Sequence, residues 1–514
     1  MTESSGTNPF KQLSQFVPPM ALRSVTSRDG LGVYASSDTL YKGAVFGRDS
    51  LEVAEDLLDT NRALTRRILL TLGSLQGELD NPTNEEEPGR IVHEYRQRKV
   101  DGKPLRGEQL TIYERLASAW GEENGSIAYY GSIDATPMFV RAVGRYVHRY
   151  GERLLQEKVT LLRSYGSELP VTLSMRIIVE NALSWLNTAL NRSESGLLEF
   201  KRRNDAGDFN PNQAWKDSRE SYVHTSGELA NHSGPIASIE VQGLVYDAFQ
   251  TAASLFPQKS EYYLHRAQEL RDRTIELMWQ PDQQYFALGT DYDNAGKLRT
   301  IRTRMANAAA LLDSYFFYDL PEEARKQYVS GIVRTIMSHD FLTDAGIRSR
   351  AISESELIPF WDYHGSFVSW PKETYDIAKG LRRQGFPALA RQLENRLLNV
   401  CLRNLAYPEF VFVDETGVVL PVRPTKREHA GLVIDAPNRP EVVQAWTVSA
   451  IVAIIKQRTR AKLLGPASRS LQAPWQRQLE TELFAASRYM DRHFNPVTLR
   501  NSYPTRDFKL KKSA

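Results

Sequence analysis

The chain has 514 residues and a formal net charge of +3, from 65 basic and 62 acidic side chains. This balance gives no reason to expect nucleic acid as a partner. With 41% hydrophobic residues the chain can bury a large core, and its length alone would suggest about two to four domains. The single cysteine, Cys401, excludes an intrachain disulfide, and its apolar helical surroundings favour a packed core thiol.

The first 40 residues are polar with scattered Pro and Gly, and they predict an irregular arm with a short strand near 32–34. No apolar leader and no run of about 18 apolar residues occurs. The sequence therefore predicts neither a signal peptide nor a membrane span, and the cytoplasm is the expected location. The main domain is expected over 41–495 and a solvated tail over 496–514.

A long helix is predicted after Phe46-Gly47-Arg48-Asp49-Ser50, with Asp49 or Ser50 as its cap. The Arg48–Asp49 pair has two interpretations. It can be a cap with a surface ion pair, or a grip on two sugar hydroxyls in which Arg48 donates and Asp49 accepts.

Residues 76–128 are polar and show no sustained period. They contain His93-Glu94-Tyr95-Arg96, but no second His follows at the spacing of a zinc protease, so no metal site is predicted. The stretch from Tyr130 to Pro137 then leads into a helix near 136–150.

Helix follows helix from there, and strand patterns are scarce. Further helices are predicted near 152–164, 170–191, 235–256, 258–279, 303–317, 320–340, 371–384, 386–404, 440–459 and 475–494. Short strands at 410–413 and 418–422 could form a hairpin around Thr416-Gly417. The chain is therefore predicted to be all-α. A helical toroid with a pocket at one end and a two-domain helical bundle both fit this pattern.

The stretch Trp215-Lys216-Asp217 lies in a long segment, 194–234, with little helical periodicity. An indole can cover the apolar face of a pyranose ring. A carboxylic acid held partly desolvated beside it acquires a raised pKa and can protonate a leaving oxygen near neutral pH. The alternative interpretation is an exposed loop in which these residues meet by chance.

Glycoside hydrolysis needs a second carboxylate. Glu409 lies between Tyr407-Pro408 and Phe410, ahead of a predicted turn, and its alternative interpretation is a solvated hairpin glutamate. Glu441 lies at the predicted start of an apolar helix over 442–455, where the helix dipole explains a carboxylate. Glu409 is therefore preferred as the catalytic base.

Taken in order, these stretches resemble the glycogen-debranching, amylo-α-1,6-glucosidase-like group of six-hairpin glycosidases. Related enzymes are the family sixty-three glycoside hydrolases, including mannosylglycerate and glucosylglycerate hydrolases. The stretches that carry the resemblance are 46–50, 93–96, 130–137, 215–218, 240–243, 363–366 with 370–371, and 444–446. The resemblance covers about residues 41–460 and implies an (α/α)₆ barrel with short β-hairpin insertions, an inverting mechanism and no cofactor or metal.

Carried over by position, the resemblance implies that Asp217 is the general acid and Glu409 the base. It implies substrate contacts from Phe46, Arg48, Asp49, His93, Glu94, Arg96, Tyr130, Asp134, Trp215, Lys216, Gln242, Trp361, Tyr363, His364, Trp370 and Trp446. The expected partner is a carbohydrate.

The resemblance implies exo-hydrolysis of a terminal α-glucosyl unit, and a small glycoside such as glucosylglycerate or mannosylglycerate is the alternative substrate. Departures from the family pattern at 304–307 and 439–443, and the absence of a β-rich domain in 1–40, leave the substrate open. An inverting phosphorylase and a non-catalytic carbohydrate-binding protein are the competing hypotheses.

Overall fold

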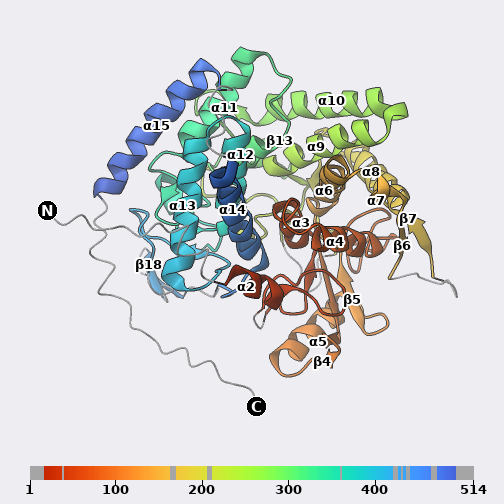
Figure 1. Ribbon diagram of the computed structural model, residues 1–514. Coiled ribbons are helices and arrows are strands. Elements are labelled where there is room, and N and C mark those ends of the chain that lie inside the picture. Colours follow the sequence, from red (N-terminus) through yellow and green to blue (C-terminus); the bar gives the residue numbers. More distant parts are fainter. Residues whose placement is uncertain are drawn as a thin grey trace.

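The computed structural model describes residues 17–37, 40–162, 170–204, 211–358, 362–420, 426–429, 432–435, 440–464 and 472–493. Six elements form a closed cycle in which each one packs against the next (Figure 1). In order they are α3 (Gly47–Asp56), α6 (Ala135–Tyr150), α9 (Ile239–Leu255), the 3-10 helix η3 (Ala306–Asp313), α12 (Pro371–Arg383) and α14 (Ala445–Leu464), which packs back on α3.

Each member of this inner cycle packs against an outer helix. The outer partners are α4 (Arg62–Ser74), α8 (Met175–Arg192), α10 (Ser260–Met278), α11 (Glu322–Ile336), α13 (Pro387–Asn404) and α2 (Pro18–Val25). A further helix, α15 (Pro474–His493), lies outside α11 and α13. The fold is thus helix-rich and built from two layers.

The inner and outer helices differ in how much of their surface is buried, and the sequence explains this difference. In α9 the buried positions include Val241, Val245, Ala248 and Phe249, which together face more than one side of the helix. The outer α10 buries a narrow stripe and exposes most of its charged residues. An all-round apolar helix is stable when it is covered on several sides, whereas a striped one needs a single covered face.

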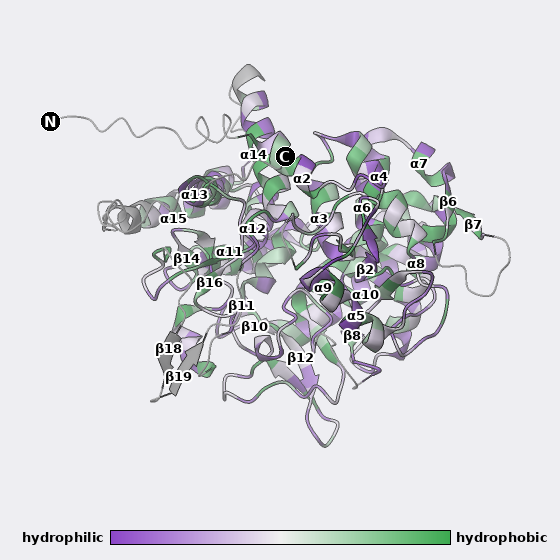
Figure 2. Cartoon of the chain, turned by 90° about the horizontal axis from the view of Figure 1, so that it is seen from below, coloured by the Kyte–Doolittle hydropathy of each residue, from purple (hydrophilic) through white to green (hydrophobic). Residues whose placement is uncertain are grey.

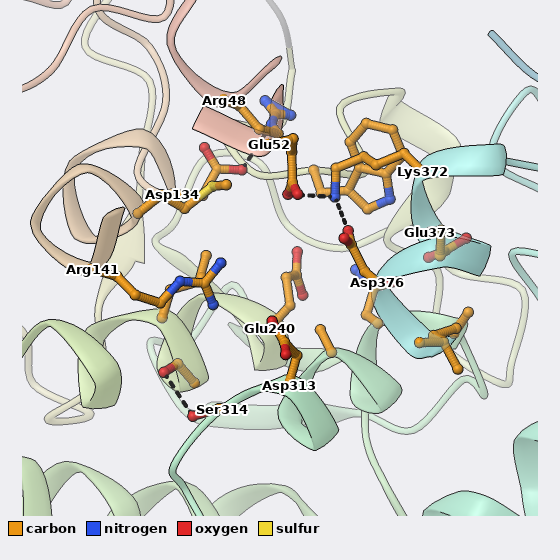
Figure 3. Close-up of a pocket in the computed structure, with 18 residues that line it drawn as sticks. Arg48, Glu52, Asp134, Arg141, Glu240, Asp313, Ser314, Lys372, Glu373 and Asp376 are labelled. Carbon is orange, nitrogen blue, oxygen red and sulfur yellow. Dashed lines mark hydrogen bonds and ion pairs between the residues drawn. The ribbon is translucent and has the colours of Figure 1, made fainter. Parts of the chain in front are cut away.

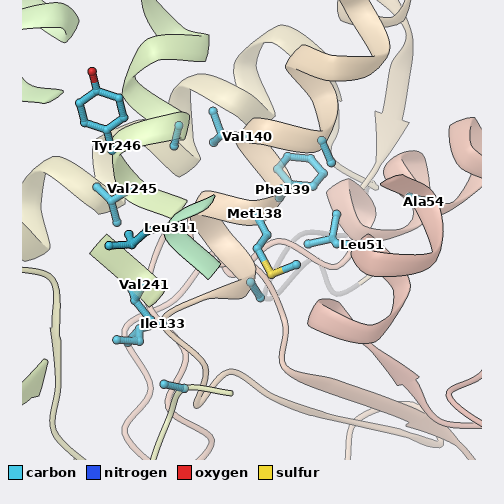
Figure 4. Packing of buried hydrophobic residues seen from close by; sticks show 14 of the residues in the cluster. Leu51, Ala54, Ile133, Met138, Phe139, Val140, Val241, Val245, Tyr246 and Leu311 are labelled. Atoms are coloured by element: carbon cyan, nitrogen blue, oxygen red, sulfur yellow. The ribbon is translucent and has the colours of Figure 1, made fainter. Parts of the chain in front are cut away.

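The inner helices interdigitate in one continuous hydrophobic core (Figure 4). Leu51 comes from α3, Phe139 from α6, Val245 from α9 and Leu311 from η3. The approach is close, because a Cβ added at Gly243 of α9 would lie 2.7 Å from Leu311 Cδ2.

Short sheets join the helices and carry the segments between them. One antiparallel sheet has the order β1 (Val45–Phe46), β2 (Glu94–Gln97), β5 (Ser126–Tyr129), and another has the order β13 (Leu298–Ile301), β12 (Gly289–Tyr292), β9 (Ile236–Ser238), β8 (Glu199–Phe200). β16 (Val368–Ser369) pairs with β17 (Val411–Phe412). In Figure 2 the β12 turn and the pair β18 (Lys426–His429) and β19 (Leu432–Asp435) lie along one edge of the molecule.

The remaining elements are short or peripheral. They are β3 (Lys99–Val100), β4 (Lys103–Pro104), α5 (Glu108–Trp120), α7 (Arg153–Gln156), β6 (Lys158–Thr160), β7 (Thr172–Ser174), η1 (Arg219–Ser221), η2 (Pro257–Lys259), β10 (Trp279–Gln280), β11 (Tyr285–Phe286), β14 (Leu342–Thr343), β15 (Gly346–Ile347) and η4 (Ile352–Leu357). No helix in the described part of the chain is both long and apolar enough to cross a bilayer.

The structure corrects several predicted elements. The long helix after Ser50 is two helices, α3 and α4, and α3 has Phe46 at its N-cap without a side-chain cap. The helix predicted at 152–164 is the single turn α7 followed by strand β6, where buried Val159 lies between exposed neighbours in the strand pattern. Within the described part of the predicted arm, 17–37, α2 is a regular helix that packs on α14.

Two further outcomes concern segments near the candidate site. The polar stretch 76–128 contains α5, which packs with β5 around a small core of its own that includes Tyr113 and Trp120. The predicted hairpin around Thr416-Gly417 is present in the described part, 410–420: Val413 bridges Val419 antiparallel, Asp414 N donates to Val418 O over 3.0 Å and Leu420 N donates to Phe412 O over 2.9 Å, while β17 also pairs with β16.

Candidate active site

The segment that carries Asp217 is fastened to the inner helices. Ile133 N donates to Gln213 O over 2.8 Å, and Arg48 Nη1 donates to Ala214 O over 3.3 Å. The ammonium of Lys216, with a fully buried side chain, lies 2.7 Å from Glu373 Oε1 and 2.8 Å from Ser349 Oγ. This segment is therefore a fixed platform and not a freely exposed loop.

Trp215 is the centre of an aromatic cluster that we define as Trp215, Phe367, Trp370, Phe410, Phe412 and Trp446. Its ring meets Trp370 edge-on at 5.1 Å between centroids and Trp446 at 5.6 Å. Tyr363 packs on the same cluster, 5.1 Å from Trp370 and 5.6 Å from Phe410. The β16–β17 pairing explains this convergence, since it places the residues after Ser369 beside those before Val411.

Asp217 projects from the platform with a quarter of its side chain exposed. Its Oδ1 lies 3.2 Å from His364 Nε2, and the His364 ring stacks on Trp370 at 4.9 Å. Burial raises the pKa of Asp217, but the hydrogen bond from His364 and the charges of His364 and Arg48 outweigh burial, so the net pKa lies below its usual value. The predicted rise in the pKa of Asp217 is therefore wrong for the ligand-free site.

Glu409 is buried, and it directly precedes Phe410, a member of the aromatic cluster. Burial raises its pKa to about 8, with further increases from the charges of Glu441, Asp49 and Asp217, against one hydrogen bond from the Glu441 backbone. Asp217 and Glu409 flank the same aromatic cluster, through Trp215 and Phe410, and the charge of Asp217 contributes to the raised pKa of Glu409. At neutral pH the free site thus holds Asp217 ionised and Glu409 protonated.

The sequence predicted Glu441 in the first turn of a helix, and this prediction is wrong. Helix α14 begins at Ala445, and Glu441 lies before it in an extended segment that runs beside 407–409. Glu409 N donates to Glu441 O, and Glu441 N donates to Glu409 Oε2, both over 3.0 Å. The helix-dipole explanation that separated the two glutamates therefore fails.

Arg48 and Asp49 do not form a pair. Arg48 is buried and its Nε lies 3.1 Å from Asp134 Oδ2, so that Asp134 holds Arg48 in place. Asp49 is partly exposed at the start of α3 and accepts a long hydrogen bond of 3.4 Å from Gln444 Nε2. Burial raises the pKa of Asp49 to about 7, although Arg48 and Lys372 lower it.

The β1–β2–β5 sheet carries another group of predicted contact residues. Phe46 pairs with Glu94 in register, and the ring of Phe46 meets that of His93 edge-on at 5.5 Å. Burial lowers the pKa of His93 to about 4, with Arg48 acting in the same direction, so its ring is neutral. Glu94 and Arg96 form an ion pair with each other on this sheet.

Some predicted contact residues instead have structural positions. Tyr130 is fully buried and its hydroxyl donates to Leu75 O over 3.1 Å. The amide of Gln242 donates to Leu198 O and Ser238 O and accepts from Leu198 N, each over 3.0 Å. Lys216 is committed to Glu373, as described above. Trp361 lies outside the described residues.

A cavity of about 70 Å³ adjoins the platform at Trp215 (Figure 3). Arg48, Trp215 and Lys372 line it together with the charged residues Glu52, Asp134, Arg141, Glu240, Asp313, Glu373 and Asp376. Lys372 Nζ bridges Glu52 at 2.9 Å and Asp376 at 2.7 Å, and it lies 4.6 Å from the centre of the Trp215 ring. Asp217 and Glu409 do not line this cavity, but the candidate site residues Arg48, Asp134 and Trp215 do, so the cavity adjoins the candidate site.

Sequence reasoning missed several residues of the site. Burial raises the pKa of Tyr41, and the charges of Glu409 and Asp217 raise it further. The ring centroids of Tyr41 and Phe46 are 5.5 Å apart. Lys372 was missed because helical spacing alone assigns it to a solvated face. Gln444 belongs to the stretch 444–446 that carries the family resemblance, but no substrate contact was predicted for it. The structure places its amide beside Asp49.

Comparison with known proteins gives one kind of match. No family model and no curated protein matches the sequence. Among solved structures, a GH63 mannosylglycerate hydrolase from Thermus thermophilus in complex with glucose aligns with a TM-score of 0.54 and 15% identity, over 86% of this chain and 100% of that one. A variant of an enzyme solved as a glycosidase aligns with a TM-score of 0.50 and 13% identity, over 88% and 99%. At these identities the likeness shows a shared helical fold.

Proposed function

We propose that the protein is an inverting, exo-acting glycoside hydrolase built on an (α/α)₆ barrel, with Asp217 as general acid and Glu409 as general base. The observation that carries the proposal is the pair itself. Two carboxyl groups from distant segments share one site against the aromatic cluster, and their pKa values are displaced in opposite directions. Separated pKa values mark an acid–base pair, and here their order is the reverse of the usual one, because the proposed acid has the lower pKa.

The pair holds one proton over a wide range of pH. Because the pKa of Asp217 is lowered and that of Glu409 is about 8, the resting proton lies on Glu409. In the proposed mechanism the reactive form carries this proton on Asp217, which donates it to the leaving oxygen while ionised Glu409 accepts a proton from water. Both forms contain one proton, so kcat/KM is expected to fall as pH rises past about 8.

Unpaired polar atoms of the aromatic cluster and of Gln444 support a sugar as the ligand. Trp215 Nε1, Trp446 Nε1 and Gln444 Oε1 are buried without a hydrogen-bond partner in the described structure. Buried polar groups without partners are uncommon in folded proteins. Sugar hydroxyls both donate and accept, so a pyranose ring packed against the Trp215 region could satisfy donors and acceptors together.

We favour a small α-glycoside, such as glucosylglycerate, over a branched polymer. The support is the solved structure that aligns over its whole length, which is named a mannosylglycerate hydrolase and holds glucose. A terminal α-glucosyl unit of a larger glucan is the second candidate, supported by the sequence resemblance to debranching enzymes.

Hydrolysis is favoured over phosphorolysis because of Glu441. A phosphorylase would bring a phosphate anion where water enters, next to Glu409. The Glu441 carboxylate, with its backbone bonded to Glu409, makes that side of the site negative and repels an anion.

The test is a screen of the purified protein against α-glucosides and glycosylglycerates, with proton NMR to follow the anomer first released. We expect the β-anomer from an α-linked substrate and no sugar phosphate when phosphate is present. Initial release of the α-anomer would contradict inversion, and sugar binding without turnover would favour a non-catalytic role.

A further inference from the structure

Three chain segments lie side by side at Glu409, and the N-terminal arm is the outermost. Ser36 bridges Gln444 antiparallel, and Tyr407 bridges Val443 in parallel. Ser37 N donates to Val443 O over 3.1 Å, and Ala445 N donates to Ala35 O over 2.8 Å. The segment that carries Glu441 is therefore held between the arm and the segment that carries Glu409.

The two oxygens of the Glu409 carboxyl group have different surroundings. Oε2 accepts the hydrogen bond from Glu441 N over 3.0 Å. Within the described residues no hydrogen bond reaches Oε1. A backbone donor cannot rotate away as a side chain can, so Oε2 is fixed and Oε1 is the oxygen left to accept a proton from water.

The side chain of Glu441 is also fixed, but by the arm. It is buried, and its Oε2 accepts a hydrogen bond of 2.7 Å from Ser36 Oγ. A second carboxyl group beside a base is costly to bury, so its retention needs either a structural or a functional reason.

We propose that Glu441, held by Ser36, is a positioning residue for Glu409. Its backbone N–H orients the base, and its charge keeps a proton on Glu409 until substrate is bound. This inference rests on the proposed function of Glu409. The groups that face Glu409 from the surrounding elements are Tyr41, Asp49, Asp217, Tyr363 and Glu441, and three of them are carboxyl groups.

Glu441→Gln isolates the charge, because it keeps the backbone donor and an oxygen for Ser36. Removing a neighbouring negative charge stabilises the ionised form of Glu409. We expect the alkaline limb of kcat/KM to move to lower pH by about one unit, the scale of a nearby charge. Glu276→Gln, which changes an exposed glutamate paired with Arg273, should leave the profile unchanged.

A direct titration separates this inference from the proposed function. Protein labelled at the glutamate side-chain carboxyl carbon gives a ¹³C signal for Glu409, assigned by its loss in Glu409→Gln. Its midpoint should fall in Glu441→Gln whether or not any glycoside is hydrolysed. An unchanged midpoint in a folded Glu441→Gln protein would overturn the inference, while a wild type that hydrolyses nothing would overturn the proposed function alone.

Azide distinguishes positioning from direct catalysis. A small anion can replace a deleted carboxylate, so Glu409→Ala should regain turnover with azide and Glu441→Ala should not. If azide rescues Glu441→Ala while Glu409→Ala keeps its activity, Glu441 is the base and the positioning role is wrong. Ser36→Ala should reproduce part of the shift in the pH profile, because it releases the Glu441 side chain.

Discussion

Asp217 differs from a typical free aspartate by its contact with His364, and that contact keeps it ionised before substrate arrives. Asp217→Asn should lower kcat on an unactivated glycoside about a hundred- to ten-thousand-fold, because an amide cannot donate the proton. On a glycosyl fluoride, whose leaving group needs little protonation, the loss should be much smaller. Equal losses on both substrates, measured by initial rates, would remove Asp217 from the acid role.

Arg48 connects the start of α6 to the platform, and its predicted sugar contact with Asp49 stays a prediction. Its guanidinium reaches Asp134 and Ala214 O together, a geometry that a lysine ammonium cannot reproduce. Arg48→Lys should therefore lower kcat by about one to two orders of magnitude through displacement of Asp217, with a smaller effect on KM. Arg62→Lys on the outer helix α4 is the control, and an unchanged kcat in Arg48→Lys would show that the platform does not need this bridge.

The buried carboxyl group of Glu409 should make the folded state less stable as pH rises. Its pKa increases from 4.5 to about 8 on folding, so the folded state binds the proton more tightly. That stabilising contribution is complete below the unfolded pKa and is lost as pH rises through the folded pKa. Glu409→Gln, which is always neutral, should melt at a higher temperature than wild type at pH 8.5, and the gain should shrink at pH 5.

The matched control for this experiment is Asp282→Asn, since Asp282 is exposed and paired with Arg302. Its melting temperature relative to wild type should show no such trend between the two pH values. A Glu409→Gln protein that melts below wild type at both pH values would contradict the expected cost of the buried carboxyl group.

At the scale of elements, α12 and η3 approach closely at Gly380. A Cβ there would lie 2.6 Å from Leu312 Cβ and 2.8 Å from Asp313 N, and the latter is backbone that cannot rotate away. Gly380→Ala should therefore lower the free energy of unfolding by about 1–3 kcal/mol, measured by denaturant titration. Gly234→Ala, where the nearest atom is 3.6 Å away, should have little effect.

Helical spacing predicted most of these elements but not their ends. Leu64, Ile68 and Leu72 identified α4 correctly, because a repeating apolar stripe is a local property of the sequence. The break between α3 and α4 was missed, since their apolar positions continue the same period across it. The start of α14 at Ala445 was also missed, because tertiary pairing with Tyr407 and Ser36 holds 441–444 extended.

In the candidate site, too, local sequence patterns did not predict contacts between residues that are far apart in the chain. Trp215 and Asp217 could be selected from the sequence because they are neighbours with complementary chemistry. The relations of Arg48 with Asp134, Asp217 with His364, and Glu441 with Glu409 depend on which segments the fold brings together. The family resemblance located these segments, and the raised pKa expected of Asp217 failed because His364 was not foreseen as its partner.

At the scale of the whole molecule, the inner cycle is closed by α14 packing on α3. Ser449 Oγ donates to Asp56 Oδ2 over 2.9 Å across this junction. A protein truncated after residue 444 lacks α14 and leaves the inner face of α3 uncovered. It should show no cooperative thermal transition by circular dichroism.

Truncation after residue 471 is the matched control, because it removes α15, which lies outside α11 and α13. This protein should keep a cooperative transition at a reduced melting temperature. A cooperative transition in the shorter fragment would show that the cycle does not need its last member.

The junction between α3 and α14 also determines when the fold can close during synthesis of the chain. Contacts between residues this far apart in sequence form late, because the intervening chain must first be ordered. The ribosome releases α3 early, and α14 follows after about four hundred further residues. The apolar face of α3 that α14 covers is therefore exposed during most of translation. Nascent chains with such uncovered surfaces are prone to aggregation and are typical clients of chaperones. The same delay means that Asp49 and Glu441 come together only after most of the chain has been made.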